Sequence, residues 1–130
     1  MNPVWVDIST VLAIHEQQIA EHGGLLGIRD WAAIESALGR PLNLLLYNNP
    51  DIFDLAAAYG FGLAKNHGFT DGNKRTAYVV TRLFLMLNGQ DIYAPAVEKV
   101  VTFEKLGEGE IDQKGLSAWL RAHAHRTGIK

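Results

Sequence analysis

The residues best suited to chemistry lie together between positions 66 and 75, where the sequence reads NHGFTDGNKR. The imidazole of His67 can take a proton from a hydroxyl group near neutral pH. Four residues later, the carboxylate of Asp71 offers the kind of oxygen that magnesium binds when it also contacts phosphates. Phe69 lies between them and is expected to anchor the loop by packing its ring inward. This spacing places a general base and a metal ligand on one loop.

The chain then enters a helix at Gly72, and this entry favours an anion. Glycine permits a backbone shape that turns the following amides outward, and the first amides of a helix have no partner inside it. With the helix dipole, the amides of residues 72–75 form an anion site. Lys74 and Arg75 add positive charge where a helix start disfavours it unless an anion is bound. Polyphosphate is the expected anion, which points to phosphoryl or nucleotidyl transfer.

Each of these residues alone has a simpler interpretation. A single histidine, or a single Asp-Gly turn, is most often structural. The other histidines are interpreted in this way. His15-Glu16 begins like the zinc-protease pattern H-E-x-x-H, but Ile19 stands where the second histidine ligand is needed. His15 and His22 are expected at a surface or an interface.

The elements that must position the loop are nearly all helical. Apolar residues at helical spacing, acidic N-caps and glycine stops predict six helices. Their expected ranges are 7–22, 30–38, 50–66, 72–88, 95–107 and 112–124. The stretch 42–50 is expected to form a short hairpin or an irregular loop. Since no segment alternates with period two for long enough to build a sheet, the prediction is a single all-α domain over residues 1–130.

The helices on either side of the loop have apolar residues on almost every side (IFDLAAAYGFGLA and AYVVTRLFLML). A helix without a polar face is normally buried. These two helices are therefore expected to form a central, buried, antiparallel pair. Gly60 and Gly62 in the first of them indicate close helix packing rather than a dinucleotide loop, because no strand precedes them.

Composition narrows the function classes without selecting one. The chain has 130 residues, which suits one core, and 12 basic against 14 acidic residues give no general attraction to nucleic acid or anionic membranes. The absence of cysteine excludes disulfides, a thiolate nucleophile and cysteine zinc sites. No apolar run reaches the roughly 18 residues of a membrane span, and the first residues lack a signal-peptide pattern. The expected setting is soluble and cytoplasmic.

The nine residues 67–75, HGFTDGNKR, match the signature HxFx(D/E)GN(G/K)R. By this match the sequence is identified as a member of the Fic/Doc superfamily, and it resembles the Doc (death-on-curing) branch. Other parts of the chain also look like landmarks of that branch, namely residues 22–24, 27–30, 35–38, 40–41, 56–59, 87–89 and 119–120. The resemblance implies an all-α Fic fold and a toxin of a bacterial toxin–antitoxin pair.

The resemblance also implies roles for individual residues. His67 would be the base for a target hydroxyl, and Asp71 would hold Mg²⁺. The backbone of residues 72–75, with the side chains of Asn73 and Arg75, would bind the phosphates of ATP. Residues 42–49 occupy the place of the substrate-aligning flap of Fic proteins, where Tyr47 or Asn48 would touch the protein substrate.

Three departures from the Fic pattern bear on the reaction. Adenylyl-transferring Fic proteins have glycine where this chain has Lys74 and a second arginine where it has Tyr78. A lysine would fill space that the α- and β-phosphates need, so the resemblance implies a Doc-like kinase that transfers the γ-phosphate to a threonine of translation elongation factor Tu. Gly68 replaces the usual proline and is expected to leave the loop looser.

Two other functions remain open on the sequence. The same site could transfer AMP, or the fold could be an inactive binding module that sequesters a partner. The sequence contains no Fic-type inhibitory segment, S/T-x-x-x-E-G/N, so control is expected from a separate antitoxin. By resemblance, a disordered antitoxin segment would fold into a groove, and that groove should expose apolar surface in the isolated chain.

Overall fold

Six helices and one short sheet make up the computed structural model, which describes residues 1–127. The helices are α1 (Ile8–His22), α2 (Trp31–Tyr47), α3 (Ile52–Asn66), α4 (Asn73–Leu87), α5 (Ala96–Glu108) and α6 (Gln113–His123). The sheet pairs β1 (Gln90–Ile92) with β2 (Ala124–Arg126) antiparallel. The predicted fold class, all-α with about six helices, is confirmed. The last three residues of the predicted 1–130 domain lie outside the described part.

Aspartates set the starts of four of these helices. At the first residue before α1, α2, α3 and α6, an aspartate side chain accepts a hydrogen bond from a backbone N–H in the first turn. Such a cap satisfies an amide that has no partner within the helix. The capping residues are Asp7, Asp30, Asp51 and Asp112. Because each cap is local in sequence, these starts fall close to the predicted positions.

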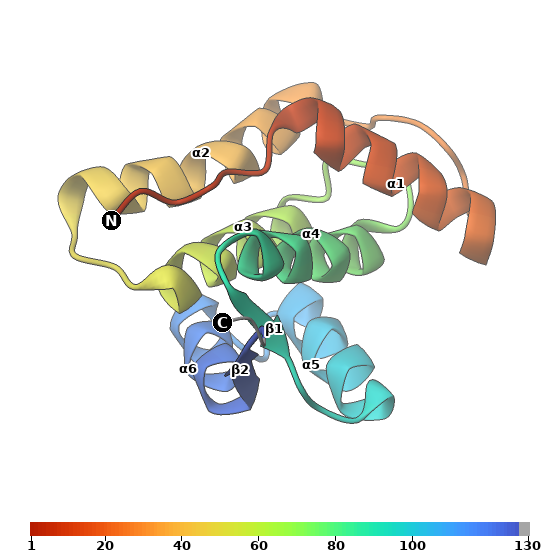
Figure 1. Cartoon of the computed structure of the whole chain (residues 1–130). Helices are drawn as coiled ribbons and strands as arrows, with labels where there is room; N and C mark the ends of the chain where they lie inside the picture. The colour runs from red at the N-terminus through yellow and green to blue at the C-terminus, as the bar shows by residue number, and fades with distance from the viewer. Residues whose placement is uncertain (128–130) are drawn as a thin grey trace.

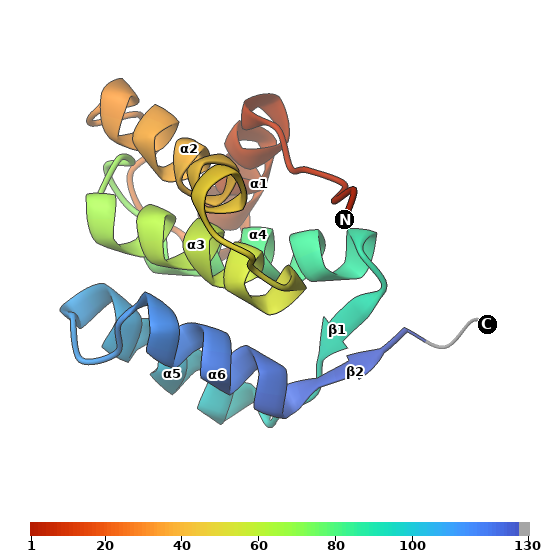
Figure 2. The same ribbon diagram turned by 90° about the vertical axis from the view of Figure 1, so that its left-hand side faces the viewer.

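The helices form three stacked pairs (Figure 1). Helices α1 and α2 cover one side of the central pair α3 and α4, and α5 and α6 cover the other side with the small sheet beside them. The view turned by 90° shows the same three layers (Figure 2). Helix α3 packs against α2, α4, α5 and α6, so it has protein on nearly every side. The loop between α3 and α4 therefore extends from the most buried part of the chain.

Close packing around α3 depends on its glycines. A Cβ atom on Gly60 would lie 2.5 Å from the hydroxyl oxygen of Thr81 in α4. A Cβ atom on Gly62 would lie 3.0 Å from the Cα of Ala37 in α2. Real Cβ atoms do not approach neighbours this closely, so larger residues would push the helices apart. The interpretation of Gly60 and Gly62 as packing residues is confirmed.

Helix α4 is less enclosed than its sequence suggests. Its inward face, which includes Ala77, Val80 and Phe84, is fully buried, whereas Arg82 and Met86 are exposed. The predicted central pair of α3 and α4 is therefore present, with one face of α4 exposed. Its neighbours α1, α3, α5 and β1 leave one face uncovered, and the composition of a helix does not determine how many neighbours surround it.

Helix α2 continues through Pro41 to Tyr47, so the expected helix end near Leu38 and the expected hairpin or loop over 42–50 were wrong. A proline inside a helix removes one backbone hydrogen bond and costs about 3 kcal/mol. Pro41 is buried, and Leu44 and Leu45 pack against the core. The burial of these apolar side chains compensates for the lost hydrogen bond.

The sequence did not predict the small sheet. Its strands have three residues each, with Gln90 opposite Arg126 and Ile92 opposite Ala124. Three residues are too few to show a period-two pattern, so the sequence carried no signal for them. No helix in residues 1–127 has both the length and the apolar character that crossing a membrane requires.

Candidate functional site

The motif loop, residues 67–72, joins the buried end of α3 to the start of α4. His67 directly follows α3 and has a left-handed backbone, with φ 51° and ψ 45°. It is the one non-glycine residue with positive φ among residues 1–127, and its side chain is exposed. Backbone strain of this kind persists where the surrounding structure fixes the residue, and it is common at functional sites. The turn directs the imidazole to solvent at the end of the most buried helix.

Asn73 holds the middle of the motif loop. Its side-chain oxygen accepts a hydrogen bond from the backbone N–H of Phe69 at 3.0 Å, and its side-chain NH₂ donates to the carbonyl of Phe69 at 2.9 Å. Phe69 is buried, as its expected anchoring role requires. Both ends of the Asn73 amide are therefore used inside the loop, and the backbone N–H of Asn73 makes no hydrogen bond within residues 1–127. The contact between the Asn73 side chain and a phosphate, which the resemblance implies, stays a prediction.

Residues 24–30, which connect α1 to α2, lie along the motif loop and bond to it. The carbonyl of Gly68 accepts hydrogen bonds from the N–H groups of Arg29 and Asp30 at 2.8 and 2.9 Å. The N–H of Thr70 donates to the carbonyl of Gly27 at 3.1 Å.

Gly68 itself is buried, and a Cβ atom there would collide with Ile34 of α2. The missing side chain of Gly68 lets the loop lie against α2. That Gly68 leaves the loop looser than a proline would stays a prediction.

Asp71 is fixed through two of its oxygen atoms. Oδ2 accepts a hydrogen bond from the N–H of Leu25 at 2.9 Å, and the backbone carbonyl lies 2.8 Å from Nε2 of His15. Oδ1 makes no hydrogen bond within residues 1–127 and can face a cation. No group of three or more acidic, histidine or cysteine side chains in that range could hold a metal alone. The site therefore fits Mg²⁺, which takes one or two carboxylates together with phosphate oxygens and water.

The start of α4 differs from the four aspartate-capped starts. Gly72 takes the N-cap position with φ 76°, and no side chain in the described chain caps this end. The backbone N–H groups of Asn73, Lys74 and Arg75 make no hydrogen bond within residues 1–127. Three unpaired amides at the positive end of a helix dipole attract an anion. The chain places them two to four residues after Asp71 and six to eight residues after His67.

The two cations of the motif reach toward different neighbours. The ammonium of Lys74 lies 2.9 Å from a carboxylate oxygen of Glu104 in α5, and a Cβ atom on Gly107 would lie 2.7 Å from Cε of Lys74. Arg75 donates to the carbonyl of Gly23 at 3.0 Å. Lys74 therefore lies along α5, where Gly107 makes room for its aliphatic chain. This contact differs from the expectation that Lys74 fills the space beside the phosphates.

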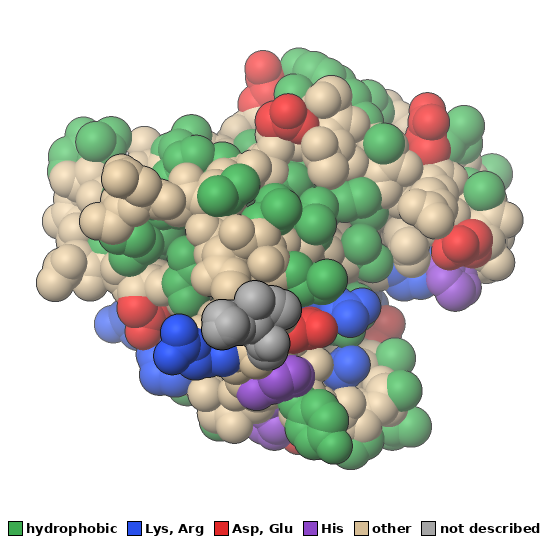
Figure 3. All heavy atoms as spheres, viewed as in Figure 1, with side chains coloured by type: hydrophobic (Ala, Val, Ile, Leu, Met, Phe, Trp, Pro, Cys, Tyr) green, Lys and Arg blue, Asp and Glu red, His purple; other side chains and the backbone are tan. Residues whose placement is uncertain are grey.

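A groove runs beside this site between α1, α4 and α5. Its cavity has a volume of about 460 Å³, and its lining includes His22, Lys74, Arg75, Tyr78, Lys99 and Val100. Val100 is 62% exposed, and its neighbour Val97 is 73% exposed. Figure 3 shows hydrophobic side chains at the surface over α5. We call this surface the α1–α4–α5 groove.

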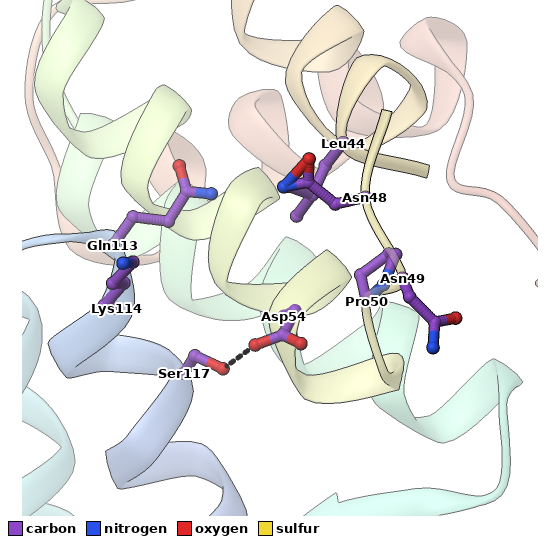
Figure 4. Close-up of a pocket in the computed structure, with 8 residues that line it drawn as sticks. All are labelled: Leu44, Asn48, Asn49, Pro50, Asp54, Gln113, Lys114 and Ser117. Atoms are coloured by element: carbon purple, nitrogen blue, oxygen red, sulfur yellow. Dashed lines mark hydrogen bonds between the residues drawn. The ribbon is translucent and has the colours of Figure 1, made fainter. Parts of the chain in front are cut away.

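The structure does not bring Tyr47 and Asn48 to the motif loop. They lie at the end of α2, beside the start of α3, and the 15 residues of α3 span about 22 Å between them and His67. Asn48 lines a separate pocket with Leu44, Asp54 and other residues (Figure 4). Residues 24–30, rather than 42–49, lie along the motif loop.

Sequence reasoning missed two residues at the site. His15 was expected at a surface or an interface, but it is 2% exposed and stacks on Phe69. Its spacing of four from both Val11 and Ile19 was a usable signal, because it places His15 in the apolar stripe of α1. Glu104 had no such signal, since its pairing with Lys74 joins residues 30 positions apart.

Comparison with known proteins agrees with the motif. Residues 5–85, more than half of the chain, match the Fic/DOC family. The chain is similar to "Protein kinase doc" of Escherichia phage P1, with 36% identity over 84 residues that cover 64% of this chain and 67% of that protein. It is also similar to "Toxin Doc" of Mycolicibacterium smegmatis (strain ATCC 700084 / mc(2)155), with 40% identity over 75 residues that cover 55% of this chain and 57% of that protein. With its signature loop placed between the two central helices, the chain belongs to the Fic/DOC family.

Proposed function

We propose that this protein is a Doc-like toxin that transfers the γ-phosphate of ATP to a hydroxyl of a protein. The proposed target is a threonine of translation elongation factor Tu, whose modification would arrest translation. The observation that carries the proposal is the uncapped start of α4 directly behind Asp71 and His67. Four other helices of the described chain use an aspartate at this position and α5 begins at Pro95 without a side-chain cap, but at α4 the three free amides follow Asp71 and His67.

The proposed reaction uses few groups of the protein. The target hydroxyl gives its proton to an imidazole nitrogen of His67 while its oxygen bonds to the γ-phosphorus. The bond from that phosphorus to the bridging oxygen breaks, and ADP leaves. The amides of residues 73–75 and the guanidinium of Arg75 stabilise negative charge on the phosphates, which is the main form of catalysis in phosphoryl transfer.

Asp71 would hold Mg²⁺ through Oδ1, and the ion would neutralise charge between phosphate oxygens. The Leu25 N–H keeps Oδ2 in place and so orients the carboxylate before the ion binds. Arg75 must leave the carbonyl of Gly23 if its guanidinium is to reach a phosphate. The free energy lost when this hydrogen bond breaks is modest, because Arg75 is exposed. A hydrogen bond from a charged group is worth about 1.5–3 kcal/mol, and a bond to a phosphate would replace it.

Transfer of the γ-phosphate rather than AMP is supported by Lys74, by Tyr78 and by the name of the phage P1 relative, a protein kinase. Lys74 would have to leave Glu104 to fill the space beside the phosphates. Tyr78 lines the α1–α4–α5 groove, where an AMP-transferring protein would offer an arginine.

The experiment that tests this choice supplies ATP labelled at one phosphate at a time. The purified chain is incubated with Mg²⁺ and elongation factor Tu, and then with a bacterial lysate. We expect label on the protein from γ-labelled ATP only, and none with the His67→Ala variant. Label from α-labelled ATP would establish AMP transfer at the same site.

A third result would favour the binding-module interpretation. In that case neither label would be transferred, and growth inhibition would survive both His67→Ala and Asp71→Ala. Toxicity that depends on both residues would exclude simple sequestration of a partner.

The α1–α4–α5 groove is the proposed docking surface of an antitoxin, a partner that the name of the mycobacterial relative as a toxin also suggests. Among its lining residues are three lysine or arginine side chains and one acidic side chain, Glu104. The exposed valines of α5 add an apolar rim. An amphipathic helix with acidic residues beside its apolar face fits this surface, because it buries the valines and pairs with the cations.

A charge placed in the groove should disrupt this docking. We expect Val100→Glu to weaken binding of the cognate antitoxin by at least about 100-fold, because it buries a carboxylate against apolar surface. Leu46→Glu is the matched control, since Leu46 is 74% exposed and lies at the far end of α2. Titration calorimetry measures both affinities. Equal binding by Val100→Glu and the unaltered chain would place the antitoxin elsewhere.

A further inference from the structure

His15 of α1 lies beneath the motif loop and contacts it in two ways. Its ring stacks on the ring of Phe69, with 3.8 Å between ring centres and 9° between planes. Its Nε2 lies 2.8 Å from the backbone carbonyl oxygen of Asp71. The side chain is 2% exposed and so lies inside the protein. No role in the proposed transfer has so far been assigned to it.

The direction of the hydrogen bond follows from the chemistry of its two partners. A carbonyl oxygen only accepts hydrogen bonds, so Nε2 of His15 must carry the proton and donate it. The bond therefore requires a proton on Nε2 of the ring. A buried donor without its acceptor is unfavourable, so the ring and the Asp71 carbonyl hold each other in place.

Ile19, one helical turn after His15, completes the contact between α1 and the loop. A Cβ atom on Gly72 would lie 3.1 Å from Cδ1 of Ile19 and 3.8 Å from the ring of His15. The loop therefore rests closely on this face of α1 at Asp71 and Gly72. Asp71 also carries the carboxylate of the site, and Gly72 leads directly into the free amides of α4.

We infer that His15 is a positioning residue of the phosphate site. By holding the carbonyl of Asp71, it sets the orientation of the Asp71–Gly72 peptide, and with it the direction of the Asp71 carboxylate and of the first amides of α4. Leu25 fixes the carboxylate from one side, and His15 fixes the backbone from the other. The inference rests on the proposed function in one respect, since it takes Mg²⁺ with ATP as the ligand of this site.

A packing role alone would not require a histidine at position 15. Phenylalanine has a similar ring and could stack on Phe69 without the donor. His15→Phe therefore removes the hydrogen bond and retains the stacking, whereas His15→Gln keeps an N–H donor and removes the stacking. His123→Phe is a matched control, because His123 also stacks on an aromatic ring, Trp119, and bonds to a backbone carbonyl through one ring nitrogen.

The test measures equilibrium binding of ATP to the whole chain as the Mg²⁺ concentration is raised. We expect the half-saturating Mg²⁺ concentration to rise about tenfold in His15→Phe, as is common when the partner that orients a metal ligand is lost. It should rise less in His15→Gln and stay unchanged in His123→Phe. A purely structural role would lower the melting temperature and leave the Mg²⁺ dependence of the folded fraction unchanged, and that result would overturn the inference.

A second measurement needs no variant and decides the matter if His15→Phe does not fold. The ¹⁵N chemical shifts of the His15 ring in the unaltered chain report which nitrogen carries a proton. Protonation at Nε2 supports the inference, and protonation at Nδ1 alone removes the hydrogen bond on which it depends.

The two proposals can fail separately. A chain that binds ATP with Mg²⁺ but transfers no phosphate contradicts the proposed function, and its binding curves still test His15. A chain that shows no Mg²⁺-dependent binding of ATP contradicts both.

Discussion

Replacing His67 with alanine should reduce transfer of the γ-phosphate by about 10²- to 10⁴-fold, the usual contribution of a general base. The same change should leave the fold intact. His67 is exposed and makes no hydrogen bond within residues 1–127, so it contributes little packing energy. Its loss should shift stability by no more than about 0.5 kcal/mol, as is usual for surface substitutions. Rates with γ-labelled ATP and thermal unfolding curves measure the two effects.

The backbone of His67 calls for a second variant. At φ 51° a residue with a Cβ atom is strained, and asparagine tolerates this conformation better than alanine does. His67→Asn should therefore be as inactive as His67→Ala and at least as stable. If either variant transferred phosphate at the rate of the unaltered chain, His67 would not be the base.

Replacing Asp71 with asparagine should lower Mg²⁺-dependent transfer by at least about 100-fold, because the metal supplies several kcal/mol of charge stabilisation. Asparagine retains a side-chain oxygen that can accept from the N–H of Leu25, so the loop should keep its position. What is lost is the negative charge that holds the ion. The rate measured over a range of Mg²⁺ concentrations gives the effect.

Asp112→Asn is the control for this change. Asp112 caps α6, away from the motif loop, and asparagine is an equally good capping residue. The control removes the same charge and should leave both transfer and its Mg²⁺ dependence unchanged. If both variants lost the same fraction of the transfer rate, the effect would come from the change in net charge. If Asp71→Asn kept the full rate at every Mg²⁺ concentration, Asp71 would not be the metal ligand.

Features that depend on residues close in sequence were predictable. The aspartate caps and glycine stops determine where most helices begin and end, because each cap bonds to an amide only three residues away. The motif of residues 67–75 was recognisable for the same reason, since His67, Asp71 and the uncapped amides of α4 follow one another along the chain. The family was therefore predictable from nine residues.

The sequence also determined that α3 is the central helix. Its run of alanine, glycine and leucine residues has no polar side, and such a helix is stable only when other elements cover it completely. Helix α4 is central too, but one of its faces, which includes Arg82 and Met86, is exposed. The difference between the two helices depends on how many neighbours each one has.

Contacts between distant segments were decided only by the tertiary structure. Helix α2 continues through Pro41 because the core accepts Leu44 and Leu45, and no local rule accounts for that gain. The flap was placed at Tyr47 and Asn48 from sequence, whereas residues 24–30 lie on the motif loop.

The surroundings of the proposed catalytic groups depend on such contacts in the same way. His15 bonds to a residue 56 positions later, Leu25 to one 46 positions later, and Lys74 to one 30 positions later. The sequence by itself determined which groups can do the chemistry, because their types and order along one loop are local properties. Only the fold decided what orients them, because packing brings α1, its following turn and α5 against the loop, and that packing depends on the whole core at once.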